Sequence, residues 1–295
     1  METTIVRSPL DDHYLLYIDV LGFEELADSS PARVDDLFEI IASLNVHDHP
    51  TFSAIVFSDT ILVHNVVKPA DDDDRRYIVM YQCEFYQDLI HRLIGRGVWL
   101  RGVLTYGPFR HYELNGTPYF YGPALNKAYH ADKSLNLTGL VMDDHCHRYS
   151  QIFKSQPLGE GWNYVFVTQG LDEFEELCEG TIPVPWIVLE ELGWNLGPEL
   201  ELLAGSLRMS KTHPDSRVRE KHVETLRLYR SRYPKTFTTL EPLAFRMEAV
   251  SKRFDWGRVR ELLREDYSGA AEKRPPTPGG ARRRRAENKS RPDGG

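Results

Sequence analysis

The sequence has few cysteines and no long apolar run. Cys83, Cys146 and Cys178 are too few and too widely spaced for a disulfide framework or a cysteine-rich zinc site. No segment approaches the roughly 20 apolar residues that span a bilayer, and the first residues lack the basic-then-apolar layout of a signal peptide. These absences predict a cytoplasmic protein of a reducing compartment, with no membrane partner.

Positive charge is also scarce outside the C-terminal end. The net charge is -8, although residues 271–295 hold eight Lys and Arg against three Asp and Glu, which leaves about -13 for residues 1–270. An acidic body does not suit duplex DNA, so no DNA partner is expected. The Pro, Gly and Arg content of the last segment predicts a disordered basic tail.

Short apolar runs alternate with helical patterns in the first half of the chain. Strands are predicted at 14–20, 52–57, 60–66, 98–106 and 139–142, and helices at 34–44, 77–93 and 123–133. Gly107-Pro108 should end the fourth strand, and the acidic run from Asp71 to Asp74 is expected to be a solvated loop. The order strand, helix, strand, strand, helix, strand predicts an α+β fold with a ferredoxin-like βαββαβ core and helices on one face.

Three regions are expected. The first, residues 1–170, is the predicted catalytic domain. Residues 171–270 form a mixed or helical C-terminal extension, with IPVPWIVLE at 182–190 and helical stretches at about 215–231 and 236–265. Residues 271–295 are the basic tail.

Two acidic residues occupy the ends of neighbouring predicted strands. Asp19 begins the string DVLGF, and Asp59 lies at the tip of the hairpin formed by FSAIVF and TILVHNV. Taken singly, each acid is more simply explained as a helix cap or a turn residue. Together they suit a pair of hard divalent ions, which take oxygen ligands and substrate phosphates. Gly22 would let a phosphate approach the backbone, and a helix beginning near Phe23 would direct free N–H groups at it.

Four segments in this order resemble class III adenylyl and guanylyl cyclases. DVLGFEEL is similar to their first metal-binding segment, FSDTILV to the hairpin with the second acid, LRGVLTYG to the next core strand, and YGPALNKAYHAD to an Asn-bearing segment. The resemblance covers roughly residues 14–140 and implies a class III cyclase core, to which the predicted helical C-terminal extension is added. It also implies two Mn²⁺ or Mg²⁺ ions per site. The implied metal ligands are Asp19, Val20 and Asp59, and the implied nucleotide-binding positions are Val20, Leu21, Gly22, Phe23, Ile55 and Tyr119.

The resemblance further implies a homodimer with each active site at the subunit interface. Asn126 matches the family's ribose-orienting Asn, but His130 stands where the family has a transition-state Arg. An imidazole can stabilise negative charge only when it is protonated. Lys127 or Arg101 is a possible replacement, although an ordinary surface or edge charge is the simpler interpretation of each.

The base-reading positions of purine cyclases hold Ile55 and Tyr119 in this chain instead of polar groups. This resembles the bacterial pyrimidine cyclases of Pycsar antiphage systems. It predicts formation of 3′,5′-cyclic UMP and diphosphate from UTP, with the product activating a downstream antiviral effector. The alternatives are a cytidylate or purine cyclase, a catalytically inactive nucleotide-binding module, and a nucleic-acid polymerase palm with the same sheet and paired acids.

Overall fold

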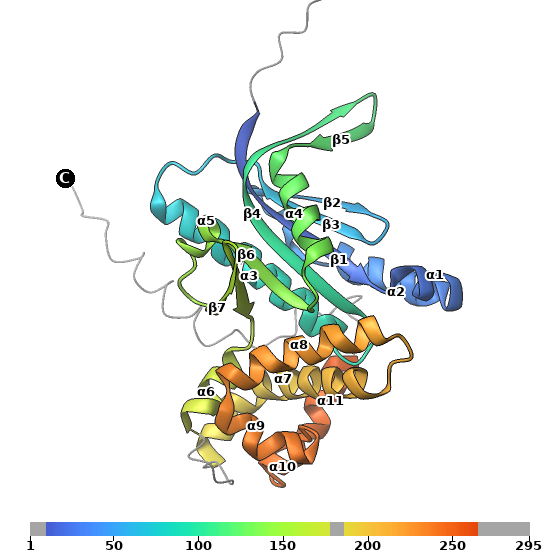
Figure 1. Cartoon of the computed structure of the whole chain (residues 1–295), viewed down its shortest axis with the longest axis vertical. Coiled ribbons are helices and arrows are strands. Elements are labelled where there is room, and N and C mark those ends of the chain that lie inside the picture. Colours follow the sequence, from blue (N-terminus) through green and yellow to red (C-terminus); the bar gives the residue numbers. More distant parts are fainter. Residues whose placement is uncertain (1–9, 178–185, 265–295) are drawn as a thin grey trace, which may run out of the picture. The chain divides into compact units, whose positions relative to one another are not determined.

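The computed structural model describes residues 10–177 and 186–264. Residues 11–166 contribute one sheet of eight strands, in the order β2-β3-β1-β4-β6-β8-β7, with β5 paired to β4 (Figure 1). The strands are β1 Asp11–Leu21, β2 Phe52–Phe57, β3 Thr60–Asn65, β4 Trp99–Leu114, β5 Thr117–Tyr121, β6 Gly139–Asp143, β7 Lys154–Gly159 and β8 Trp162–Phe166.

The helices in the first part of the chain are α1 Phe23–Ser29, α2 Pro31–Ala42, α3 Asp72–Leu93, α4 Pro123–Ser134 and α5 Asp144–His147. Those that follow the sheet are α6 Gln169–Leu177, α7 Trp186–Thr212, α8 Ser216–Arg232, α9 Pro234–Leu240, α10 Met247–Val250 and α11 Trp256–Arg264. Two short 3₁₀ turns, Asn45–Asp48 and Glu241–Leu243, complete the described elements.

The four strands β2-β3-β1-β4 form the predicted ferredoxin-like core. β1 lies between β3 and β4 and is antiparallel to both, and β2 forms a hairpin with β3. Helices α1 and α2 connect β1 to β2, and α3 connects β3 to β4. This arrangement confirms the predicted α+β class and the βαββαβ order.

Successive side chains of β1 point to opposite faces of the sheet, and each face packs against a different set of helices. Ile18 and Val20 belong to the large core formed with α2 and α3. Leu15 and Tyr17 pack on the other side, in a smaller cluster that includes the alanines of α4. Because strand side chains alternate between faces, Asp19 lies on the same face as Leu15 and Tyr17. The two core helices share one face, as predicted, and α4 covers the other.

The prediction that Gly107-Pro108 ends the fourth strand is wrong. β4 continues to Leu114, and Pro108 pairs in register with Asp12 of β1. On its other side, β4 pairs with β6 only over Arg101–Leu104 and with β5 only over Arg110–Leu114. Pro108 therefore falls where one side of the strand has no partner, which is where a strand tolerates a missing N–H.

The acidic run is also not a loop. Asp71 caps α3 by accepting hydrogen bonds from the backbone N–H groups of Asp73 and Asp74, and residues 72–74 form the first helical turn. Acidic side chains stabilise a helix N-terminus because they complement its partial positive charge. The run is solvated as expected, but the helix begins five residues before the predicted start at Tyr77.

The helices after the sheet bury a second core against β6 and β8. Val141 and Tyr164 of the sheet pack with Leu196 and Leu200 of α7 and with Tyr229 of α8. The predicted stretch 215–231 is helical, as α8. Of the string IPVPWIVLE, residues 182–185 lie outside the described residues and the rest begins α7.

The predicted helix at 236–265 is wrong because it is divided into α9, a 3₁₀ turn, α10 and α11. Pro242 lies in the 3₁₀ turn, and Ala244 and Phe245 have left-handed backbones with φ of 54° and 53°. Neither feature is compatible with a continuous α-helix. The predicted basic tail at 271–295 lies outside the described residues.

Cys83 and Cys146 are buried free thiols, as the cysteine count predicts, whereas Cys178 lies outside the described residues. Within the described ranges, no helix is both long enough and apolar enough to cross a bilayer.

Candidate functional site

The structure places the two predicted acids next to each other at one end of the sheet. Asp19 pairs in register with Thr60 of β3, and Asp59 occupies the turn immediately before that strand. The Val20 N–H donates a 2.8 Å hydrogen bond to the carbonyl oxygen of Asp59, which fixes the turn against β1. Ser58 adopts a left-handed backbone with φ of 53°, so the hairpin is tight. The side chains of Asp19 and Asp59 therefore start from neighbouring backbone positions.

Arg101 of β4 lies directly across from Asp19 and is 3% exposed. Its Nη2 is 3.7 Å from Asp19 Oδ2, its Nε donates to Asp132 Oδ1 at 2.5 Å, and its Nη1 donates to the Leu135 carbonyl at 2.9 Å. The interpretation of Arg101 as an ordinary surface or edge charge is therefore wrong. Three nitrogens of one guanidinium contact three different groups, which only arginine's fork can do.

Asp132 is the component that sequence reasoning missed. It is fully buried on α4, where Lys133 Nζ lies 3.6 Å from its second carboxylate oxygen. The sequence contains one signal for this position, because Asp132 follows Ala128 by four residues and Ala128 is on the buried face of the helix. A carboxylate on an otherwise apolar helical face must have a buried partner, and that partner is Arg101.

Burial, and after it the negative charge of Asp132, raise the pKa of the Asp19 carboxyl from 3.8 to about 6, although Arg101 opposes the shift. The Asp19 carboxylate is therefore a partly desolvated anion, and Arg101 offsets only part of the cost of its ionisation. No group of three or more metal-ligating side chains occurs among residues 10–177 and 186–264. Two carboxylates and the Val20 carbonyl nonetheless fit Mg²⁺ or Mn²⁺, because such ions complete their coordination with substrate phosphates and water.

The raised pKa predicts how replacing Asp19 affects stability. Because the folded pKa lies above the unfolded value, ionisation of Asp19 costs stability progressively as the pH rises from 3.8 to 6, and the cost is complete above that range. Asp19→Asn removes this cost. We expect it to raise the free energy of unfolding of the metal-free protein at pH 7 by at most about 3 kcal/mol, and to change it little near pH 4. Urea unfolding at the two pH values measures the difference, and equal changes at both would contradict the prediction.

The other residues of the first segment contribute backbone groups. The side chain of Val20 is buried in the core with α2 and α3, and the Phe23 ring packs against Phe38. Leu21 is half-buried. Gly22 has a left-handed φ of 74° and precedes α1, which begins at Phe23 as predicted. Any phosphate contact from this segment must therefore come from peptide groups and not from side chains.

Asn126 and His130 are exposed on α4, four residues apart and hence on one helical face. The buried face of that helix carries Ala128 and Asp132. One protomer therefore does not bring Asn126 and His130 together with its own Asp19 and Asp59. Lys127 is engaged elsewhere, because its Nζ lies 2.5 Å from Asp143 and over the Trp162 ring.

The two base-reading positions lie in different environments. Ile55 is 8% exposed and packs with Leu62 and the alanines of α4. Tyr119 is 44% exposed on the β4–β5 hairpin, where its ring stacks on Tyr112 with centroids 5.5 Å apart. The alternative that Tyr119 is a core aromatic is therefore wrong.

Solved structures with similar folds include nucleotide cyclase domains. The adenylyl cyclase CyaB from P. aeruginosa is 11% identical, with a TM-score of 0.42 over 52% of this chain and 93% of that one. The guanylyl cyclase domain of the RhoGC fusion protein from the aquatic fungus Blastocladiella emersonii is 14% identical, with a TM-score of 0.43 over 54% and 96%. No protein-family model and no curated protein matches the chain. Similarity this distant assigns no activity, which must be argued from the site itself.

Proposed function

We propose that the chain is a nucleotidyl cyclase that forms 3′,5′-cyclic UMP and diphosphate from UTP. The observation that carries this proposal is the pairing of Asp19 and Asp59 at adjoining positions of β1 and the β2–β3 turn, fixed by the Val20 to Asp59 hydrogen bond. The order of the four segments supports it, because in that order Asp19 and Asp59 match the metal-binding acids of the class III cyclases that the sequence resembles.

In the reaction, the ribose 3′-oxygen forms a bond to the α-phosphorus as the bond to the diphosphate oxygen breaks, and the 3′-hydroxyl proton passes to solvent. Two divalent ions, held by Asp19, Asp59 and the Val20 carbonyl, would supply activation of the hydroxyl and charge neutralisation of the diphosphate. Arg101 keeps Asp19 in place from β4 and holds positive charge beside it. The peptide N–H groups at Gly22 and the start of α1 would donate hydrogen bonds to the phosphates.

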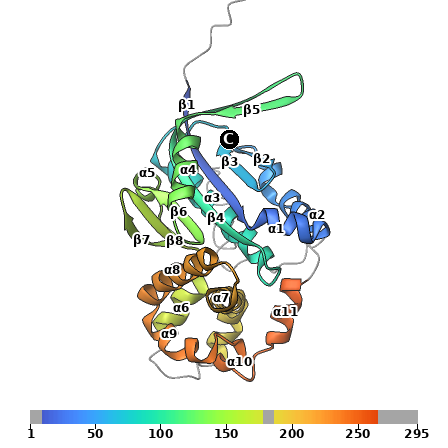
Figure 2. The same ribbon diagram turned by 45° about the vertical axis from the view of Figure 1, so that its right-hand side comes forward.

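A second protomer completes the site in this proposal. Asn126 and His130 face away from their own chain's acids and are exposed, which suits side chains that act on a nucleotide held by a partner copy. The β4–β5 hairpin, which carries Tyr119, extends beyond the rest of the sheet, so it could also reach a partner copy (Figure 2). Asn126 would orient the ribose, and a protonated His130 would stabilise charge at the reacting phosphorus.

The pyrimidine preference rests on Ile55. A buried aliphatic side chain leaves the amine or carbonyl of a purine without a partner, at a cost of about 1–3 kcal/mol. That cost corresponds to roughly 5-fold to 150-fold discrimination. By resemblance to the Pycsar enzymes, the cyclic nucleotide would activate a neighbouring antiviral effector.

We expect the purified chain with Mn²⁺ to form cyclic UMP in preference to cyclic AMP by roughly 5-fold to 150-fold. Chromatography of the products from each of the four triphosphates measures the preference. Tyr119→Ala should reduce the preference if its ring contacts the base, and Leu114→Ala, at an exposed position of the same hairpin, is the matched control. A preference for ATP or GTP would refute the pyrimidine assignment and leave the cyclase proposal standing.

A second candidate is a nucleotide-binding module without catalysis, favoured by His130 in place of the transition-state Arg. It predicts calorimetric binding of UTP and no cyclic product with Mn²⁺ or Mg²⁺. Formation of any cyclic nucleotide excludes this candidate.

A further inference from the structure

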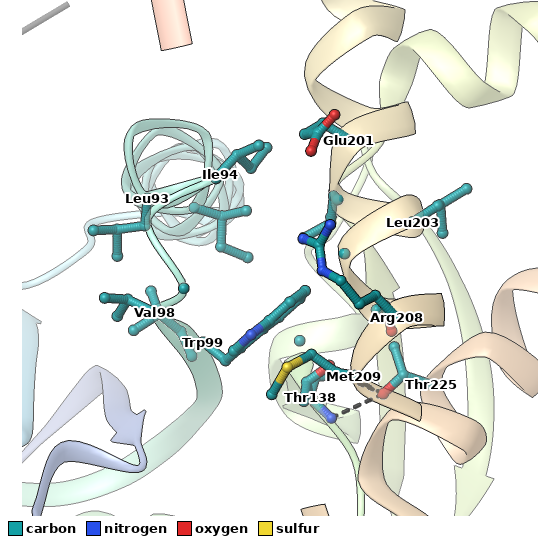
Figure 3. Close-up of a pocket in the computed structure, with 18 of the residues that line it drawn as sticks. Leu93, Ile94, Val98, Trp99, Thr138, Glu201, Leu203, Arg208, Met209 and Thr225 are labelled. Carbon is teal, nitrogen blue, oxygen red and sulfur yellow. Dashed lines mark hydrogen bonds between the residues drawn. The ribbon is translucent and has the colours of Figure 1, made fainter. Parts of the chain in front are cut away.

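A cavity of about 190 Å³ lies where α3, the start of β4 and the end of the loop before β6 meet α7 and α8 (Figure 3). Its wall is mostly apolar, and Leu93, Ile94, Val98 and Trp99 form the side opposite α7. An engineered apolar cavity of about 150 Å³ binds benzene, so this space accepts a ligand of roughly ten non-hydrogen atoms. It does not include Asp19 or Asp59.

The cavity wall is held in place by hydrogen bonds and ring contacts. The Trp99 ring meets the edge of His222 with centroids 4.5 Å apart, and His222 Nδ1 lies 3.0 Å from Ser206 Oγ. The Thr138 N–H donates to Thr225 Oγ1 at 2.9 Å. These polar groups of the wall bond to one another, so the cavity is preformed and offers few free donors.

Arg208 is the exception. Its guanidinium points from α7 into the space beside Trp99 (Figure 3). Arg208 is exposed, and within the described part of the chain its guanidinium makes no hydrogen bond or ion pair. A Cβ placed on Gly205 would lie 3.2 Å from the Trp99 ring and 3.8 Å from Arg208 Nη2, so the glycine keeps this end of the cavity open. The one acidic residue of the lining, Glu201, lies two turns away on α7.

We propose that this cavity binds a small amphiphilic carboxylate, with its apolar body against Trp99 and Leu93 and its carboxylate on Arg208. An unpaired guanidinium at the rim of an apolar cavity suits an anion, because a carboxylate satisfies its fork with two hydrogen bonds. A cationic head group would be repelled by Arg208. A neutral one would leave the exposed guanidinium hydrogen-bonded to water and would gain nothing from its charge.

The ligand would control the catalytic site through β4, and this part of the proposal rests on the proposed function. Trp99 is two residues from Arg101, and Thr138 directly precedes Gly139, which pairs with Arg101 in the sheet. Filling the cavity restrains β4, which carries Arg101, and β6, which pairs with β4 at Arg101. Because Arg101 holds Asp19, a bound carboxylate favours the arrangement of the acids that accepts metal and nucleotide.

Calorimetry with octanoate, octylamine and octanol tests the ligand class on the full chain without nucleotide. We expect binding of octanoate, binding at least about 10-fold weaker for the other two, and about 10-fold weaker octanoate binding by Arg208→Gln. Gly205→Leu should abolish octanoate binding because its side chain fills the cavity. If Gly205→Leu does not fold, Gly205→Ala replaces it and should weaken octanoate binding. Glu201→Gln is the matched control and should bind octanoate at least as well as the wild type.

The proposed site would be overturned if octanoate did not bind. It would also be overturned if octanoate bound Arg208→Gln and both Gly205 variants as tightly as it binds the wild type. Tighter binding of octylamine that depends on Glu201 would overturn the ligand class.

For the regulatory part, saturating octanoate should raise turnover of UTP at least about 5-fold, and only in proteins that bind it. Binding without any change in turnover of an active enzyme would refute the coupling. Binding by a chain that forms no cyclic product would refute the cyclase and not the site.

Discussion

Asp59→Asn should reduce metal-dependent formation of cyclic nucleotide by at least about 100-fold and leave the fold intact. Asp59 is half-buried in a turn, and its contact with β1 is made by its backbone carbonyl, so the substitution keeps the Val20 hydrogen bond. The amide removes the negative charge that holds a divalent ion, and a two-metal reaction fails when either ion is misplaced. Turnover with Mn²⁺ and circular dichroism measure the two parts of the prediction.

Asp48→Asn provides the matched control, because Asp48 is exposed on the 3₁₀ turn that precedes β2. It should leave turnover within about twofold of the wild type. Cyclisation by Asp59→Asn at the wild-type rate would remove the acid pair from the mechanism. An unfolded Asp59→Asn protein would show that the turn needs the carboxylate for structure.

The core of the fold was predictable because its signals are local. The apolar run at 14–20 and the two β-rich runs around Ser58-Asp59 identify three strands, and the regular apolar spacing from Tyr77 to Leu93 identifies a helix. The predictions that were wrong concern features that depend on tertiary contacts. Pro108 is accepted in β4 because one side of the strand has no partner there, and no local pattern shows which side of a strand is unpaired.

The site was predictable in part for the same reason. Asp19 and Asp59 follow recognisable strand ends, so their meeting could be inferred from the hairpin. The partners of Asp19 could not, because Arg101 and Asp132 come from β4 and α4 and meet only when the sheet is assembled. A charged residue on an apolar face was the available signal for both. The roles of Asn126 and His130 depend on a second chain and stay predictions.

Arg101→Met should cost about 3–5 kcal/mol of unfolding free energy, the largest stability effect expected of any substitution near the site. Asp132 is fully buried, and Arg101 Nε is its 2.5 Å partner. Removing the guanidinium leaves that carboxylate and Asp19 without their shared counter-charge. Arg101→Lys should recover only part of the loss, since one ammonium cannot reach Asp132, Asp19 and the Leu135 carbonyl together. Urea unfolding at pH 7 measures each change.

A double substitution separates stability from function at this position. Arg101→Met with Asp132→Leu removes both buried charges, so it should be more stable than Arg101→Met alone, because an apolar pair replaces an ion pair at little cost. Turnover should remain low in the double variant, because Asp19 still lacks the group that positions it. Arg227→Met breaks an exposed ion pair with Glu224 on α8, and it is the control, with an expected cost below about 1 kcal/mol. If Arg101→Met costs no more than Arg227→Met, the buried pair does not stabilise the fold. If the double variant regains full turnover, Arg101 serves the fold and does not position Asp19.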